Sequence, residues 1–302
     1  MIYFVWGSTY LAIRVGVREF PPFLMAGLRF SAAGFAMWLW MRITGVPSLT
    51  WQEWRGATVL GTLMFLIDYA CLFWAEQRVP SGVAALILAM IPVCITLLEI
   101  IVLRTQHLSF QLGLGLLVGI FGVAVLMNPH TSFGEAPIDR RGAIALLVAC
   151  VGWSVGTIVT KRITLPASKP MSAATQMLTG GVQLLVLSVI AGEFSGFHAQ
   201  RISGIAWFSL VYLIVAGSIV AFTAYVWLLH YESPTRVGTY AYVNPVVAVI
   251  LGALLGGEIV GRRTILGTAL IMVSVVAITT VKSKLTKAQN ESLREPARAA
   301  AE

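Results

Sequence analysis

The feature that most constrains this chain is a series of ten long apolar runs, separated by short polar or charged segments. A helix needs about 17 to 25 mostly apolar residues to cross roughly 30 Å of hydrocarbon. With 58% hydrophobic and only 11% charged residues, the 302-residue chain is far more apolar than a soluble domain, in which about a quarter of residues are charged. We therefore predict an all-α integral membrane protein with ten transmembrane helices. The expected helices cover residues 2–17, 23–41, 57–75, 82–103, 110–127, 142–160, 173–191, 205–229, 237–255 and 264–281.

The chain also contains an internal repeat. The apolar run around Pro92 recurs 153 positions later around Pro245, and Trp74 precedes the first run as Trp227 precedes the second. Each proline removes a backbone hydrogen bond and is expected to bend its helix. Because five helices, an odd number, separate the two copies, the second copy is predicted to lie upside down in the membrane. The predicted fold is therefore ten transmembrane helices in two inverted five-helix repeats.

The predicted repeats divide the chain into consecutive parts. Trp6 and Arg14 are eight residues apart, as are Trp153 and Lys161, which matches the first helix with the sixth. The first run has only five residues before Trp6, so we expect either a start downstream of the natural initiation site or an unusually short first helix. The expected parts are a first five-helix repeat (1–128), an inter-repeat loop (129–141), a second five-helix repeat (142–283) and a cytoplasmic tail predicted to be disordered or a short helix (284–302).

The basic residues predict the orientation of the chain. The net charge of +8 is spread through the loops, and in a membrane protein this pattern indicates orientation instead of nucleic-acid binding. Counting loops alternately places twelve Lys and Arg residues on the side of the termini and eight on the other side. Because basic residues accumulate on the cytoplasmic side, both termini are predicted to be cytoplasmic.

Charged and polar side chains inside the apolar runs are the candidate functional residues. The head of Arg29 is expected to reach the membrane surface, to meet a carboxylate or a row of carbonyls, or to line a substrate path. Asp68 and Tyr69 lie near the centre of the third run, where a carboxylate needs either a cationic partner or a water-filled cavity. In a cavity Asp68 could serve proton coupling, whereas pairing with a helix-end arginine would make it structural.

The ninth run carries polar residues on one helical face. Tyr240 and Asn244 are four residues apart, so their side chains share one side of the helix. The matching positions in the fourth run are Ile87 and Ile91. A cavity between the copies would then be polar on one side and apolar on the other, which suits an amphipathic or aromatic small molecule. Alternatively, the two polar residues bond each other or a neighbouring backbone.

The chain has no pattern typical of an enzyme. The four histidines lie in loops or at helix ends without metal-ligand spacing, and the three cysteines fall inside apolar runs. No glycine-rich loop followed by lysine is present to bind phosphate. We therefore expect no catalytic residue, no metal and no cofactor.

Several motifs point to one known family. They are Trp6-Gly7-Ser8, the segment WAEQRVPSG at 74–82, and the segment YAYVNPVVA at 240–248, which is followed by Gly-Gly-Glu at 256–258. With these motifs, the chain resembles the drug/metabolite transporter superfamily, and specifically the permeases of its EamA family, over nearly its whole length to about residue 283. One departure is Thr105, which stands where the first copy would match Glu258 with an acidic residue.

The resemblance implies ten helices in two inverted five-helix repeats around a central cavity, and export of amino acids, other metabolites or drugs across a bacterial inner membrane. We therefore predict a secondary transporter that works by alternating access. The candidate lining residues are Trp6, Asp68, Tyr69, Trp153, Tyr240 and Asn244, and Asp68 is the candidate for proton coupling.

Two alternative functions remain open on the sequence alone. A lipid-carrier flippase could use the same fold, and a membrane sensor or assembly subunit could use it without transport. The expected partners are a small-molecule substrate and the lipid bilayer, with no nucleic acid. Whether copies of the chain associate into a homo-oligomer is also left open.

Overall fold

The structure is a computed structural model that describes residues 1–106, 108–127, 138–231 and 240–299, without the side chains of 226–227, 229–231, 240–242 and 282–299. The described residues form helices joined by turns, with no strand. The elements up to the inter-repeat loop are α1 (Ile2–Gly16), α2 (Pro22–Ile43), α3 (Trp51–Leu60), the π-helix η1 (Gly61–Ile67), α4 (Asp68–Glu76), α5 (Ser81–Leu88), α6 (Ile91–Ile101) and α7 (Phe110–Met127). Those after it are α8 (Arg140–Val159), η2 (Thr160–Arg162), α9 (Lys169–Ile190), η3 (Ala199–Arg201), α10 (Gly204–Tyr212), the π-helix η4 (Leu213–Val220), α11 (Ala221–Tyr231), α13 (Tyr240–Leu254) and α14 (Arg262–Ala299).

The apolar runs account for the membrane-spanning character of these helices. Among the described residues, eight helical stretches are long and apolar enough to cross a membrane: 22–43, 51–76, 81–101, 110–127, 140–162, 169–190, 204–225 and 262–281. The two remaining runs correspond to α1, which has 15 residues, and to the shorter apolar helix within α13. The predicted all-helical membrane fold is therefore confirmed, while ten membrane crossings in two inverted repeats stay a prediction.

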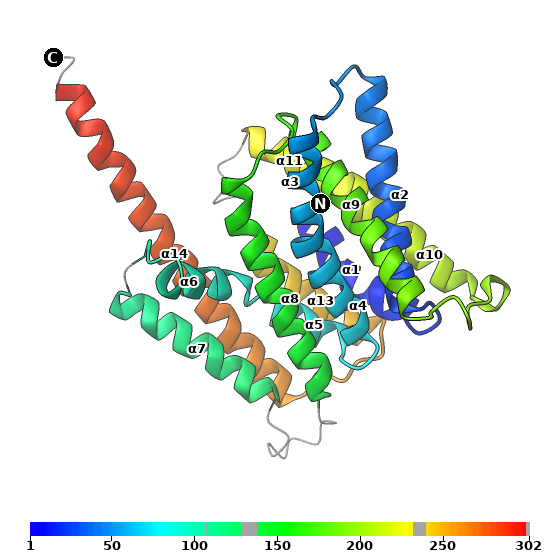
Figure 1. The fold of residues 1–302 in the computed structure, drawn as a ribbon. Helices are drawn as coiled ribbons and strands as arrows, with labels where there is room; N and C mark the ends of the chain where they lie inside the picture. Colours follow the sequence, from blue (N-terminus) through cyan, green and yellow to red (C-terminus); the bar gives the residue numbers. More distant parts are fainter. Residues whose placement is uncertain (107, 128–137, 232–239, 300–302) are drawn as a thin grey trace.

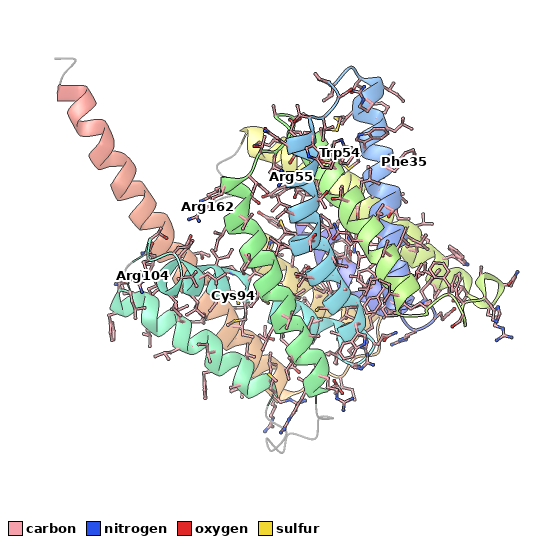
Figure 2. All side chains as sticks on the ribbon, viewed as in Figure 1. Phe35, Trp54, Arg55, Cys94, Arg104 and Arg162 are labelled. Atoms are coloured by element: carbon pink, nitrogen blue, oxygen red, sulfur yellow. The ribbon has the colours of Figure 1, made fainter. Side chains whose placement is uncertain are left out.

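Apolar side chains cover much of the outer surface. Phe35 of α2 is 51% exposed and points away from the other helices (Figure 2), and Phe208 of α10 is 68% exposed. A soluble protein rarely exposes so many large apolar side chains, but lipid tails solvate them. Figure 2 also shows Arg55 and Arg162 toward the same end of the molecule, where α3 begins and η2 ends.

Capping residues decide where several helices begin. The third helix was expected from residue 57 but begins at Trp51, six residues earlier. Thr50 accepts a hydrogen bond from the backbone of Glu53, and the Glu53 carboxylate accepts one from the backbone of Thr50, which completes a capping box. Because this cap satisfies the first amides, the helix extends into a polar segment that the hydropathy pattern leaves outside.

Two helix pairs pack closely through glycine. α2 lies against α9, where a Cβ on Gly34 would lie 2.5 Å from the backbone nitrogen of Leu178. α7 lies against α14, where a Cβ on Gly119 would lie 2.5 Å from Oγ of Ser274. Gly115 and Gly119 lie four residues apart in the fifth apolar run, and this spacing of small residues predicts close contact with a neighbouring helix. The structure confirms the prediction, since a Cβ on Gly115 would lie 3.0 Å from Cγ1 of Ile278. In Figure 1, α6, α7 and α14 form one side of the molecule, while α2, α9 and α10 form the other.

The two π-helices occupy matching places in the chain. η1 ends at Ile67 and η4 ends at Val220, 153 positions later, which is also the spacing between Pro92 and Pro245. π-Helices are rare and are frequent at functional sites. The prolines themselves differ, because Pro92 follows a break between α5 and α6, whereas α13 continues through Pro245.

The end of the chain continues α14. Residues 284–299, for which the sequence predicts disorder or a short helix, are helical up to Ala299 in this structure, and this part of α14 extends beyond the bundle (Figure 1). Alanine, lysine, leucine, arginine and glutamine, which make up much of this segment, are good helix formers.

Candidate functional site

An aromatic cluster surrounds Tyr69 at the start of α4. The Tyr69 ring lies 4.4 Å from the ring of Phe30 in α2, 5.8 Å from Phe65 in η1 and 6.5 Å from Trp153 in α8, measured between ring centroids. Phe30 and Phe65 are also in edge-to-face contact at 5.0 Å. The structure therefore brings two of the predicted lining residues, Tyr69 and Trp153, together on one aromatic surface built from four elements.

Arg29 lies against this aromatic cluster. Its guanidinium carbon is 4.6 Å from the ring centroid of Phe30 and 5.4 Å from that of Tyr69, and its Nε donates a hydrogen bond to Oγ of Ser218 in η4 at 3.1 Å. Only 3% of the residue is exposed, so its head does not reach the membrane surface. Among the described residues no carboxylate lies within 4.0 Å of it. The expectation that Arg29 reaches the surface is therefore wrong, and no described carboxylate is its partner.

Asp68 is buried in the same region but is not paired. It is the first residue of α4, directly after η1, and is 3% exposed. Its Oδ1 has no hydrogen-bond partner, and no ion pair joins it to another described residue. The expected pairing with a helix-end arginine is thus not formed in this structure, and proton coupling by Asp68 stays a prediction.

Trp6 occupies a different part of the bundle from Trp153. Its Nε1 donates a hydrogen bond to the carbonyl of Gly217 in η4 at 3.1 Å, and its ring lies 5.4 Å from that of Tyr225 in α11. Trp153 instead faces Tyr69 of α4. Each tryptophan therefore packs against the aromatic helix that follows one of the two π-helices.

The predicted polar face of α13 is described only in part. Asn244 is 9% exposed, and its backbone carbonyl lies close to Gly7 of α1, where a Cβ would be 3.0 Å from it. The side chain of Tyr240 lies outside the described residues. The proposed sharing of one face by Tyr240 and Asn244 therefore stays a prediction.

A charged cluster at one end of the bundle was not foreseen from the sequence. Nε of Arg14 in α1 lies 3.1 Å from Oε1 of Glu258, which follows α13. The Glu258 carboxylate also accepts hydrogen bonds from the backbone amides of Ser81 at 2.7 Å and Gly82 at 3.2 Å, and so caps α5. Nη1 of Arg14 donates to the backbone carbonyls of Glu76 and Val79. One ion pair thus links α1, α4, α5 and the end of α13.

The available sequence signal for this cluster was the acidic residue at the end of the ninth run. Glu258 follows two glycines, and a Cβ on Gly252 would lie 2.5 Å from its Oε2. Glu76 is 1% exposed, and neither of its carboxylate oxygens has a hydrogen-bond partner in the part of the chain that the structure describes. The spacing of residues along the chain could not show that the partner of Glu258 is the start of α5.

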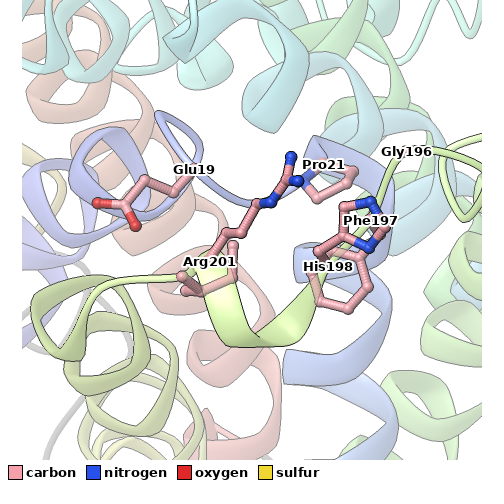
Figure 3. A pocket seen from close by; sticks show the side chains of 7 residues that line it. Glu19, Pro21, Gly196, Phe197, His198 and Arg201 are labelled. Atoms are coloured by element: carbon pink, nitrogen blue, oxygen red, sulfur yellow. The ribbon is translucent and has the colours of Figure 1, made fainter.

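A surface pocket of about 240 Å³ lies between the α1–α2 turn and η3, away from the predicted lining residues (Figure 3). Glu19, Phe197 and Arg201 contribute to its walls. The Glu19 carboxylate accepts hydrogen bonds from the backbone amide of Ser203 at 2.6 Å and from its hydroxyl at 2.7 Å. These bonds, the backbone amide first, hold the pKa of Glu19 below its ordinary value. They stabilise the start of α10, so a structural role explains why Glu19 lies in the wall of this pocket.

The described residues contain no group of three or more His, Cys, Asp or Glu placed to hold a metal ion. The fold and its buried side chains define a multi-pass membrane protein in which apolar helices enclose arginine, aspartate, glutamate and aromatic residues. The chain belongs to the EamA-like transporter family, whose sequence profile matches residues 1–128 and 140–280.

Relatives of this chain carry transporter names. The chain is 36% identical over 281 residues, covering 92% of this chain and 88% of the relative, to a protein of Escherichia coli strain K12 named uncharacterized inner membrane transporter YedA. It is 28% identical to Protein PecM of Dickeya dadantii, over 93% of this chain and 92% of that protein. A solved crystal structure with 20% sequence identity superposes with a TM-score of 0.63, covering 94% of this chain and 96% of the other, and shows a shared fold.

Proposed function

We propose that this chain is a secondary transporter that exports small metabolites, amino acids or drug-like molecules by alternating access. The observation that carries the proposal is the set of buried polar and charged side chains, Arg29 and Asp68 among them, inside apolar helices of a family named for transport. Charges at membrane depth are costly and therefore mark substrate or ion pathways. Family membership and transporter relatives also support a protein that is not an enzyme.

The proposed architecture is ten membrane crossings in two inverted repeats, 1–128 and 142–283. It is supported by helix contacts that match in pairs. α1 packs against α10, η4 and α11, as α8 packs against α3, η1 and α4. α1 also contacts α13, as α8 contacts α5 and α6. In such repeats the substrate site lies near the midplane between the copies. We place Trp6, Asp68, Tyr69, Trp153, Tyr240 and Asn244 at that site, with helix bends at Pro92 and Pro245.

Alternating access requires interactions between the two repeats that close one end of the transporter and that break when this end opens. The Arg14–Glu258 ion pair and the Glu258 cap on α5 are suited to this role, because they join elements of both proposed repeats at one end. Thr105 stands at the corresponding place of the first copy and carries no charge. The two ends of the molecule would therefore be closed by different chemistry.

The proposed location is a bacterial inner membrane, as in the name of the Escherichia coli relative, with both termini cytoplasmic. The test is transport by the purified full chain in proteoliposomes, using a panel of radiolabelled amino acids and metabolites with and without a pH gradient. Accumulation of at least one compound above protein-free liposomes is expected. Absence of transport across the panel, from protein that binds the same compounds, would favour the sensor or assembly alternative.

A further inference from the structure

The guanidinium of Arg29 is a buried cation with most of its bonding capacity unused. A guanidinium has five N–H donors, and the hydrogen bond from Nε to Ser218 uses one. Nη1 is buried and has no hydrogen-bond partner among the described residues. A buried charge that lacks a counter-charge destabilises the fold, so a protein retains one where it serves a purpose.

The residues around Arg29 fix the orientation of its guanidinium plane without neutralising its positive charge. Phe30 and Tyr69 lie against the guanidinium at 4.6 and 5.4 Å from their ring centroids, which fixes its orientation through cation–π contact. A Cβ on Gly217 would lie 3.3 Å from Nη2, so a side chain at position 217 would crowd the Nη2 side of the Arg29 guanidinium. The carbonyl of Gly217 is in turn held by Trp6, a residue of α1. The guanidinium fork, which is the planar group with the two Nη atoms of Arg29, is thus preorganised by α1, α2, α4 and η4.

The chemistry that such a fork recognises is an oxyanion. The planar pair of Nη groups matches the two oxygens of a carboxylate, and these charge-assisted hydrogen bonds are stronger than neutral ones. The aromatic surface formed by Phe30, Phe65, Tyr69 and Trp153 lies directly beside the fork. An aromatic ring bearing a carboxylate would satisfy both features at once.

We propose that Arg29 binds the carboxylate of the transported molecule, and that the substrate class is an aromatic carboxylic acid whose ring packs on the cluster around Tyr69. This inference rests on the proposed transport function, because Nη1 is closed off in the state described and the site must open toward one side of the membrane. It also explains why Arg29 is retained at membrane depth without a carboxylate of the protein.

The first test uses the unaltered full chain in detergent and three probes of similar size: 3-phenylpropanoate, 3-phenylpropanol and 3-phenylpropylamine. Binding is followed by the intrinsic fluorescence of the tryptophans. Hydrogen bonds to a charged group contribute about 1.5–3 kcal/mol, so the acid is expected to bind about tenfold or more tightly than the alcohol, and the amine most weakly. Equal affinities for acid and alcohol, or no binding of the acid, would overturn the proposal without any variant.

The second test uses variants of two arginines on α2. Arg29→Gln is expected to remove the preference for the acid, and Arg29→Lys to keep part of it, because lysine retains the charge but not the fork. Arg42→Gln is the matched control, since Nη1 of Arg42 bonds the carbonyl of Val46 at the far end of the same helix, and it should keep the full preference. A folded Arg29→Gln protein that still prefers the acid tenfold overturns the proposal.

Transport assays separate this inference from the proposed function. If the acid binds through Arg29 but neither the acid nor any compound of the panel is carried into proteoliposomes, transport is wrong and the binding site stands. If acid and alcohol are both carried at the same rate, and Arg29→Gln carries them equally well, the transport function stands and the carboxylate site is wrong.

Discussion

At the scale of single residues, the protein keeps three unusual groups away from water. Arg29 and Asp68 are each 3% exposed and Glu76 is 1% exposed, and in all three at least one polar side-chain atom finds no hydrogen-bond partner among the residues described. Because such burial is costly, each group is a candidate for a role that a fully paired residue could not fill. Substitutions that preserve shape but remove charge are the sharpest tests.

Asp68→Asn tests proton coupling. If Asp68 takes up and releases the coupling proton, the amide, which resembles the protonated acid but cannot release a proton, should abolish gradient-driven accumulation and leave substrate exchange at equal pH intact. Both activities are measured in proteoliposomes. Asp139→Asn is the control, because Asp139 caps α8 at a helix end and its exchange for Asn preserves a good cap. Full gradient-driven accumulation by Asp68→Asn would rule out the coupling role.

Glu19 provides a pH-dependent prediction outside the membrane-spanning helices. Its pKa lies below the ordinary carboxyl value in the folded state, so its contribution to stability is present above the unfolded pKa and is lost as pH falls through the folded pKa. The protection of the amides at the start of α10 against hydrogen exchange, measured relative to their intrinsic rates at each pH, should therefore decrease on acidification below about pH 4. Glu19→Gln should remove this acid-dependent step. Ser203→Ala keeps the backbone amide donor to Glu19 but loses the hydroxyl, which donates to Glu19 and also accepts from the backbone of Ala206, so it should retain part of the acid-dependent step on a less stable helix start. An unchanged step in Glu19→Gln would contradict the assignment.

At the scale of helices, Glu258 acts on elements far from it in the chain. Glu258→Ala would leave two amides of α5 and the guanidinium of Arg14 without their partner. We expect a loss of about 1–3 kcal/mol in the free energy of unfolding. Thermal unfolding in detergent measures it. Glu53→Ala is the control, since Glu53 caps only its own helix and does so through solvent-exposed hydrogen bonds. An equal loss in the two variants would remove the interhelical role.

Glycine decides how closely α7 approaches α14. Gly119→Leu should lower folded yield and melting temperature, because a Cβ there would meet Oγ of Ser274 at 2.5 Å. Gly113→Leu on the same helix is the control, as a Cβ at Gly113 would find its nearest neighbour, Leu108, at an ordinary 3.7 Å. Size-exclusion chromatography and thermal unfolding report both properties. Similar behaviour of the two variants would mean that α7 and α14 can separate without harm.

At the scale of the whole molecule, orientation can be tested at two loops. With cytoplasmic termini, the turn before α3 lies in the cytoplasm and the turn between α9 and η3 lies outside. In a cysteine-free background, Gly196→Cys should react with a membrane-impermeant maleimide in whole cells, whereas Ser48→Cys should react only after lysis. The reverse pattern would invert the proposed orientation.

The sequence by itself determined that the protein is an all-helical membrane protein of the EamA family. It also determined that Gly115 and Gly119 lie on a packing face of α7. These properties could be predicted because hydropathy, proline position and helical periodicity are local, and they act on residues within a few turns of one another.

Only the tertiary structure decided the surroundings of the charged residues. Arg29 meets Ser218, which is 189 positions away, and Glu258 caps Ser81, which is 177 positions away. The sequence allowed Arg29 to reach the surface or to pair with a carboxylate, and it contained no indication that Glu258 would cap α5. Such contacts depend on which helices become neighbours. The packing of whole helix faces against one another decides this, and the local sequence pattern does not.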